Sequence, residues 1–288
     1  MGKKFCVLFN PLSGNKNENE IKSILTKMMP GYEFRFEDVP TVSKDYPSFF
    51  RTLDSDINLL IAGGDGTLNN FVNRAGNSYG SRSVYFYPTG SGNDFWKDIG
   101  HLPGDKPANI TRYIVDLPIV EIEGQKYHFL NNVGFGLDGY CTEEGDICKQ
   151  AGKVPKYSSI AIKGMLGKFS PRKCTVTVDG KAYHYNNTWL VPTMNGRYYG
   201  GGMLAAPNQQ RLNKSKILTC SIIGNCDRIT ALLLFKDFSS GKHEKHPNNI
   251  IGIPGHRINV EFDKPCALQI DGETHRNIKS YTAYYPGF

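Results

Sequence analysis

Long apolar runs are missing from this 288-residue chain, since none approaches the about 18 consecutive apolar residues that a membrane-spanning helix needs. The N-terminus, MGKKFCVLFN, has an apolar stretch too short for a signal peptide, and it runs straight into a turn. We therefore expect a cytoplasmic protein that neither crosses a membrane nor carries a cleaved signal.

Cysteine pairs of the CxxC type are also missing, and the seven cysteines are odd in number. The sequence therefore predicts reduced thiols of a cytosolic protein, and neither disulfides nor a zinc site. No RNP-like, zinc-finger or helix-turn-helix signature is visible, so nucleic acid is not expected as a partner. The net charge of +7 alone fits an anionic nucleotide, an acidic membrane surface or nucleic acid.

A glycine-rich turn interrupts residues 57–70, INLLIAGGDGTLNN. The short apolar run before it predicts a strand buried on both faces of a parallel sheet, and Leu68, Phe71 and Val72 then follow at helical spacing. GGDGT at 63–67 is often no more than a good turn. Between a strand and a helix it also makes a phosphate cradle, because main-chain N–H groups and the helix dipole face the ligand. An acid there is useful only if a metal bridges it to the phosphates, which predicts a nucleotide with magnesium.

Two further predicted strands end in loops of the same kind. Residues 5–9 run into NPLSGNK at 10–16, and residues 83–87 run into PTGSGNDF at 88–95. Because the carboxyl ends of parallel strands lie along one edge of a sheet, where ligands bind, three such loops predict one site. A fourth strand, expected at 34–39, ends near Thr41, which either offers its hydroxyl to the nucleotide or caps the next helix.

The motifs NPLSG, GGDGTLNN and PTGSGNDF, in this order, resemble the diacylglycerol kinase / sphingosine kinase superfamily, and most closely its soluble bacterial lipid kinases. GGDGT alone is shared with NAD kinases and, loosely, with phosphofructokinases, whereas GSGND at 90–94 is the more specific mark. The likeness continues through NNVGFGLD at 131–138, GKH at 241–243 and QIDGE at 269–273, so it covers most of the chain.

The second half of the chain changes character near residues 116–119, and the length exceeds the about 100–200 residues of one domain. Alternating apolar runs with turns such as VDGK and DGE predict an antiparallel sandwich or barrel, with helices at 156–169 and 228–238. The expected strands are 119–122, 127–131, 175–178, 188–191, 217–223, 257–262 and 267–270.

We therefore expect an ATP-binding α/β domain at 1–118 and a β-sandwich domain at 119–288. The resemblance implies the same arrangement: a Rossmann-like nucleotide-binding domain of the NAD kinase and diacylglycerol kinase type, followed by an antiparallel β-sandwich, with the active site in the cleft between them.

Phosphoryl transfer from ATP needs positioned phosphates, charge neutralisation and an acceptor in line, and a base for the acceptor hydroxyl helps. The resemblance implies that the base is Glu273 of the DGE motif. Asp271 and Glu273 are two apart, so in extended backbone they point the same way. Gly272 can instead bend the chain into a hairpin turn with solvated acids. We expect Asp271 to act as a neighbour of Glu273 or as a magnesium contact.

The resemblance also assigns the nucleotide site. Asp65 is expected to meet the catalytic magnesium, directly or through water, while Lys16 either screens the phosphates or is simply solvated. Asp138 either supports magnesium through water or is a turn acid. The expected nucleotide-binding residues are Asn10, Pro11, Ser13, Gly14, Lys16, Thr41, Gly63, Gly64, Gly66, Thr67, Asn69, Gly90, Ser91, Asn93 and Asp94.

One departure from the family pattern concerns a second, structural magnesium. Bacterial members commonly carry Asp-Gly after a GGG…P segment to bind it. Residues 200–202 and Pro207 match that segment, but Lys214 and Ser215 stand where Asp-Gly belongs. An ammonium group cannot ligate a cation, so we predict that the structural second magnesium site is lost.

A lipid substrate requires access to a bilayer. Residues 229–238, ITALLLFKDF, are followed by Lys242, His243, Lys245 and His246, which suits an apolar helix with a basic flank at an anionic surface. Packing of this helix on the sandwich is the commoner alternative. A second basic cluster with apolar interleaving comprises Lys163, Lys168, Arg172 and Lys173 with Ile162, Met165, Leu166 and Phe169.

The sequence thus predicts an ATP-dependent lipid kinase that phosphorylates the hydroxyl of a lipid such as diacylglycerol, with peripheral contact at the inner membrane surface. A small-molecule kinase of the NAD kinase type and a non-catalytic nucleotide-binding protein are the alternatives. The loop at 88–95 argues against the first and Glu273 against the second. The sequence sets neither the lipid nor the oligomeric state.

Overall fold

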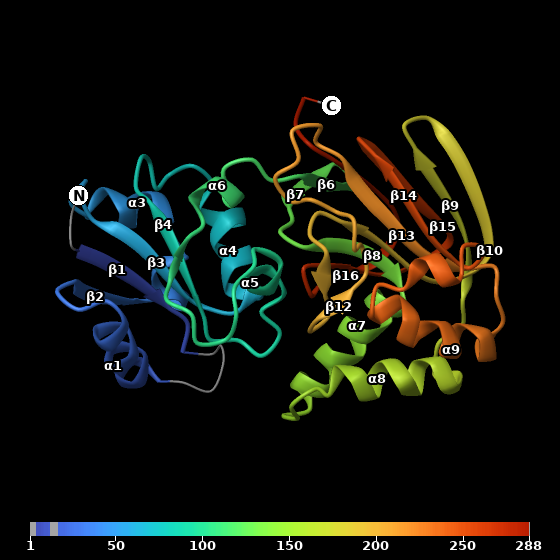
Figure 1. Cartoon of the computed structure of the whole chain (residues 1–288), viewed down its shortest axis with the longest axis horizontal. Coiled ribbons are helices and arrows are strands. Elements are labelled where there is room, and N and C mark those ends of the chain that lie inside the picture. Colours follow the sequence, from blue (N-terminus) through green and yellow to red (C-terminus); the bar gives the residue numbers. More distant parts are fainter. Residues whose placement is uncertain (1–3, 12–16, 288) are drawn as a thin grey trace. The chain divides into compact units, whose positions relative to one another are not determined.

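A computed structural model describes residues 4–11 and 17–287 of the chain. The chain divides into two compact units, Met1–Leu117 and Pro118–Phe288 (Figure 1). Each unit has its own core of buried apolar side chains. The division lies one residue before the predicted one. Among the described residues, no helix combines the length and the apolar character that crossing a bilayer requires.

The first unit is an α/β layer built on a five-stranded sheet in the order β2-β1-β3-β4-β5, parallel except for β5. Its central strand, β3, is apolar after Asn58, and residues 59–62 are fully buried. The strands are β1 (Lys4–Phe9), β2 (Glu33–Asp38), β3 (Asn58–Gly63), β4 (Val84–Pro88) and β5 (Ala108–Asn109). The helices are α1 (Glu18–Met28), α2 (Val39–Val42), α3 (Tyr46–Arg51), α4 (Asp65–Ala75), α5 (Asp94–Asp98) and α6 (Thr111–Ile114).

The second unit is a nine-stranded sheet whose pairings are all antiparallel. Both β8 and β9 pair with β10 and with β15, so these four strands close into a ring around an apolar core. The strands are β6 (Ile119–Ile122), β7 (Gln125–His128), β8 (Asn132–Gly136), β9 (Arg172–Val178), β10 (Lys181–Met194), β13 (Leu218–Gly224), β14 (Ile250–Gly255), β15 (Arg257–Ile270) and β16 (Glu273–Tyr284).

Helices of the second unit pack outside this ring, where α7 contacts β8, β15 and β16. In Figure 1, α8 and α9 lie alongside each other at one end of the unit. The remaining elements are α7 (Leu137–Gln150), α8 (Tyr157–Lys163), the π-helical turn η1 (Gly164–Lys168), α9 (Arg228–Ser239), the 3₁₀ turn η2 (His243–Lys245) and the short pair β11 (Tyr198–Tyr199) and β12 (Met203–Leu204).

The predicted fold class is confirmed, but several elements differ from the prediction, and the strands β14 and β16 were not predicted. No strand spans 127–131, because the main-chain N–H groups of Leu130 and Asn131 donate to the Asp271 carboxylate instead of to a neighbouring strand. The separate strands expected at 257–262 and 267–270 are one long strand, β15. The 14-residue helix α7 was not predicted at all.

Candidate active site

Three loops of the first unit meet at the carboxyl ends of β1, β3 and β4. The Asn10 side-chain amide, after β1, donates to Thr67 Oγ1 at 3.1 Å. The Thr89 N–H, after β4, donates to the Gly63 carbonyl at 2.8 Å. A Cβ placed on Gly90 would lie 2.7 Å from the Gly64 Cα atom. Parallel topology therefore brings the three predicted loops to one edge.

The edge where these loops meet has features of a ligand cradle. A Cβ on Gly63 would lie 2.5 Å from the Thr67 Cβ atom, so only glycine lets the strand pass this closely beneath α4. The buried atoms Thr89 Oγ1 and Asn93 Oδ1 have no hydrogen-bond partner among the described residues. Because buried polar atoms are normally satisfied, these two are available to a ligand or to water.

Asp65, the first residue of α4, ties two of the loops together. Its Oδ2 atom accepts a hydrogen bond from the Asp94 N–H at 2.7 Å, and its Oδ1 atom accepts one from the Phe95 N–H at 3.3 Å. A carboxylate offers about four lone-pair sites, and these two hydrogen bonds use two of them. The predicted metal role of Asp65 stays a prediction. Its bonding to α5 was missed, because nothing in the sequence states that residues 65 and 94 adjoin.

Asn93 and Asp94 lie where the loop enters α5. Asn93 adopts a left-handed conformation with φ of 51°, and its side-chain amide donates to the Gly90 carbonyl at 2.7 Å. Asp94 is buried, whereas Ser91 is exposed. The loop thus has a fixed local geometry in which Ser91 alone of these three side chains is fully accessible.

The other predicted nucleotide ligands have differing surroundings. Pro11 and Gly66 are exposed beside the cradle, while Ser13, Gly14 and Lys16 lie outside the described residues. Asn69 is buried in α4, where its Oδ1 atom accepts a hydrogen bond from the Asn73 amide at 3.0 Å.

Thr41 does not cap the next helix, so that alternative is wrong. Its hydroxyl and its N–H both donate to Asp38 Oδ2, at 2.8 and 3.1 Å. The caps of α2 and α3 are instead Asp38 and Asp45. The hydroxyl of Thr41 is therefore used within its own helix.

The DGE motif of the second unit forms the turn between β15 and β16. Asp271 and Gly272 both have positive φ, 46° and 88°, as a two-residue hairpin turn requires. The Asp271 carboxylate accepts hydrogen bonds from the N–H groups of Leu130, Asn131 and Asn132. Of the two expected conformations, the motif adopts the hairpin turn and not the extended backbone. Asp271 is not a solvated acid in this turn, because its carboxylate fixes the turn to the start of β8. These three bonds give Asp271 a structural role, and its role as a neighbour of Glu273 or as a magnesium contact stays a prediction.

Glu273 is the first residue of β16, where it pairs with Ile270 and is exposed. Beside it, Gln269 is only 3% exposed, and its Oε1 atom accepts a hydrogen bond from the Gly272 N–H at 2.9 Å. The predicted base thus projects from a turn that Asp271 and Gln269 hold in place.

A buried polar cluster lies on the face of β8 and β15 that α7 covers. Asn132 and Gly134 share this face, and Gln269 pairs with Gly134. A Cβ on Gly134 would lie 2.9 Å from Asp138 Oδ2. Asn132 Nδ2, Asp138 Oδ2 and Gln269 Nε2 are buried and have no hydrogen-bond partner within the described parts of the chain. Asn132 and Gln269 were missed as members, although they lie within the NNVGFGLD and QIDGE motifs.

Asp138 belongs to the first turn of α7, so the description of it as a turn acid is wrong. Burial raises the pKa of Asp138 to about 7, and the Tyr199 hydroxyl, 2.9 Å from Oδ1, opposes this shift by donating a hydrogen bond. Burial favours the neutral acid because the charged form loses its hydration. The predicted support of magnesium by Asp138 stays a prediction.

Metal ligands are sparse across residues 4–11 and 17–287, where no group of three or more His, Cys, Asp or Glu side chains is arranged to hold a cation. Magnesium typically uses one or two carboxylates together with substrate phosphates and waters. The cradle with Asp65 fits that requirement only when a phosphate is present.

At the position of the predicted second magnesium site, side-chain amides close the loop. The Ile217 carbonyl accepts hydrogen bonds from Gln209 Nε2 at 2.9 Å and from Asn213 Nδ2 at 3.0 Å. Asn213 Oδ1 in turn accepts one from the Ile217 N–H at 2.7 Å. Lys214 and Ser215 are exposed. The donors suit a loop that holds itself without a cation, and the loss of this site stays a prediction.

Comparison with known proteins agrees with this architecture. The family model of the diacylglycerol kinase catalytic domain matches residues 4–123, and that of the YegS C-terminal NAD kinase beta sandwich-like domain matches residues 131–288. A protein of Staphylococcus aureus strain JH9 named "Putative lipid kinase" is 28% identical over 229 residues, which cover 76% of this chain and 71% of that one. A protein of the same name from strain Newman matches over the same length and at the same identity.

A crystal structure described as a putative diacylglycerol kinase from Bacillus anthracis strain Sterne superposes with a TM-score of 0.67 at 20% identity, covering 98% of this chain and 94% of that one. At this identity the likeness shows the fold alone. The two domain matches define the class of protein: an α/β kinase domain followed by a β-rich domain. The chain belongs to the diacylglycerol kinase family of kinases.

Proposed function

We propose that this protein transfers the terminal phosphoryl group of ATP, with magnesium, to the hydroxyl of a lipid such as diacylglycerol. The observation that carries the proposal is the meeting of three donor-rich loops at one sheet edge, where the buried Thr89 and Asn93 oxygens have no partner among residues 4–11 and 17–287. Relatives named as lipid kinases support the lipid as acceptor. Because ATP is cytosolic, we place the reaction at the inner membrane surface.

Each residue has a defined part in this proposal. Main-chain N–H groups at the start of α4 hold the phosphates, since the helix N-terminus favours anions. Asp65 contributes its carboxylate to the magnesium, which neutralises charge on the phosphates when bound. Glu273 accepts the proton of the lipid hydroxyl, whose oxygen attacks the γ-phosphorus as the bond to ADP breaks. The products are a lipid phosphate, ADP and a proton.

The test is ATP consumption with diacylglycerol in mixed micelles, with a sphingoid base and with NAD as separate acceptors. We expect turnover with a lipid and none with NAD. Glu273→Gln should lower kcat by about 10²–10⁴-fold, the usual contribution of a general base. The matched control is Glu261→Gln in the same hairpin, where Glu261 only pairs with Lys279 at 2.9 Å on the surface. Full turnover by Glu273→Gln would remove the base assignment, and NAD phosphorylation would favour the small-molecule alternative.

Asp65→Asn tests the magnesium assignment separately. The amide keeps one of the two acceptor oxygens, so one N–H group of α5 loses its partner and we expect a stability loss of about 1–3 kcal/mol. Activity should fall by at least about 100-fold, because a neutral oxygen is a poor partner for magnesium. Thermal unfolding and ATP turnover measured on the same preparation distinguish the two effects. A variant that unfolds would show that Asp65 is chiefly structural.

A further inference from the structure

An exposed apolar patch lies where α9 meets η1 in the second unit. Ile229 and Leu233 on α9 are 73% and 72% exposed, and Leu166 on η1 is 63% exposed. Ile162 on α8 and Leu232 on α9 are also exposed. We call these five residues the α8–α9 patch.

Helix α9 is fixed to η1 at this point. The Arg228 guanidinium, at the start of α9, donates to the carbonyls of Met165 at 2.6 Å and Phe169 at 2.9 Å. Ile229 is therefore held next to η1, which exposes the apolar side chain of Leu166. The patch is one surface built from two chain segments.

Helical spacing explains why these side chains are left outside. α9 packs on the unit through Ala231, Leu234 and Phe238, which are buried. Ile229, Leu233 and the exposed Lys236 fall on the remaining face at spacings of four and three. Helix α9 thus packs on the second unit through one face and presents the opposite face to a partner.

The net positive charge of the chain falls largely in the sequence segment that carries α8 and η1. Residues 1–117 contain 13 Lys and Arg against 13 Asp and Glu, whereas residues 118–288 contain 21 against 14. Residues 151–173, which include α8 and η1, contain six cations and no acid. These cations are Lys153, Lys156, Lys163, Lys168, Arg172 and Lys173.

We propose that the α8–α9 patch and its basic surround dock the protein on an anionic lipid bilayer, with the five apolar side chains entering the headgroup region. Exposed aliphatic groups gain free energy on leaving water, and lysines near an anionic leaflet gain about 1 kcal/mol each. The α8–α9 patch is then the surface through which the protein reaches its lipid substrate in the bilayer. The link to catalysis rests on the proposed function, whereas the docking itself does not.

Charge selects this occupant over a second copy of the chain. Two copies meeting through the same patch would bring two groups of six cations together, which is unfavourable. An anionic bilayer instead offers both an apolar interior and a complementary surface charge.

The experiment is flotation of the purified full chain, without ATP, with vesicles of phosphatidylcholine alone or mixed with phosphatidylglycerol. We expect binding to the mixed vesicles, little binding to the neutral ones, and release at about 1 M salt, where the screening length is about 3 Å. Equal binding to both vesicles, or to neither, would overturn the proposal.

Two variants map the surface. Ile229→Ser with Leu233→Ser should weaken binding about tenfold or more, while Lys163→Gln with Lys168→Gln should weaken it roughly fivefold per lysine. The matched control is Leu102→Ser, because Leu102 is 68% exposed in the first unit. All three changes are at exposed side chains, and unchanged thermal unfolding confirms that the variants fold. Variants that bind as the parent does would contradict the proposal, as would a control that loses binding.

The same variants separate docking from the reaction. They should lose activity on diacylglycerol in anionic vesicles but keep it on a short-chain, water-soluble diacylglycerol. Vesicle binding without any lipid phosphorylation would leave the docking surface standing and refute the proposed function. Concentration-dependent dimers abolished by Leu233→Ser would show instead that a second copy covers the patch.

Discussion

At the residue scale, three acids in the motifs of this chain occupy different environments. Asp271 accepts three main-chain N–H groups and Asp65 accepts two, so both carboxylates hold loops in position. Asp138 has one hydroxyl donor and is buried on α7. A carboxylate that accepts several N–H bonds is stabilised as an anion, whereas burial stabilises the neutral acid.

The burial of Asp138 predicts a pH dependence of stability. Its pKa is raised from 3.8 to about 7 in the fold, so the protonated form is favoured there. This stabilisation is complete at a pH below the pKa of Asp138 in the unfolded chain, 3.8, and it disappears as the pH rises through about 7. Relative to Asp138→Asn, the free energy of unfolding of the parent protein should therefore fall by about 2–3 kcal/mol between pH 5 and pH 8. Urea unfolding of both proteins at each pH measures the difference.

The difference in the free energy of unfolding between the parent and Asp138→Asn cancels the contribution of the titrating groups that both proteins share. A difference that stays flat from pH 5 to pH 8 would mean that Asp138 is ionised in the fold. If millimolar magnesium abolishes a pH dependence of this difference that is steep without the metal, Asp138 contacts magnesium, as the family resemblance suggests.

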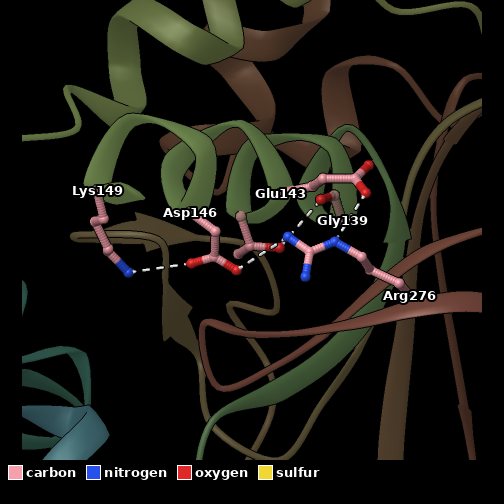
Figure 2. Close-up of polar contacts among 6 residues, drawn as sticks. Gly139, Glu143, Asp146, Lys149 and Arg276 are labelled. Atoms are coloured by element: carbon pink, nitrogen blue, oxygen red, sulfur yellow. Dashed lines mark hydrogen bonds and ion pairs between the residues drawn. The ribbon is translucent and has the colours of Figure 1, made fainter. Parts of the chain in front are cut away.

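At the scale of elements, α7 is held against the second unit's sheet by close approach and by ion pairs. A Cβ on Gly139 would lie 1.9 Å from the Ala267 carbonyl oxygen of β15. Figure 2 shows Arg276 of β16 reaching Glu143 and Asp146 on α7, with nitrogen–oxygen distances of 3.3 and 3.7 Å. Exposed ion pairs of this kind contribute little, so the fit at Gly139 matters most.

Gly139→Ala should therefore destabilise the protein by about 2–4 kcal/mol, because the helix must move away from β15 to admit a methyl group. Gly252→Ala in β14 is the matched control, since a Cβ there would lie at an ordinary 3.7 Å from Thr219 Cγ2. Urea unfolding of both variants checks the prediction. Equal, small losses would show that α7 adjusts freely.

Glycines at close contacts also explain why sequence patterns predicted β3 and α4 but did not predict α7. A buried parallel strand has a continuous apolar run, and α4 follows with apolar residues at helical spacing. In α7, Gly139 and Gly145 lower helix propensity. They are there because Ala267 and the Tyr157 ring approach too closely for any side chain. Contacts between distant segments, which also decide the partners of Asp65 and Asp271, leave no local pattern in the sequence.

At the scale of the whole molecule, the two units differ in the chemistry they present. The first unit has balanced charge and the loop cradle with Asp65. The second has all of the net positive charge, the exposed Glu273 and the α8–α9 patch. The proposed nucleotide site and the proposed docking surface therefore fall on different units, so each proposal can be tested without the other.

Hydrogen exchange of the full chain should separate these two events. Magnesium with a non-hydrolysable ATP analogue should slow exchange about tenfold or more in residues 63–67 and 89–95, because ligand binding suppresses local opening. It should leave residues 157–168 and 228–239 unchanged. Anionic vesicles should slow exchange in those two helical segments and leave the loops unchanged, with neutral vesicles as the control. Protection of α9 by the nucleotide, with the three loops unaffected, would mean that the nucleotide binds in the second unit and that the cradle at the sheet edge has another use.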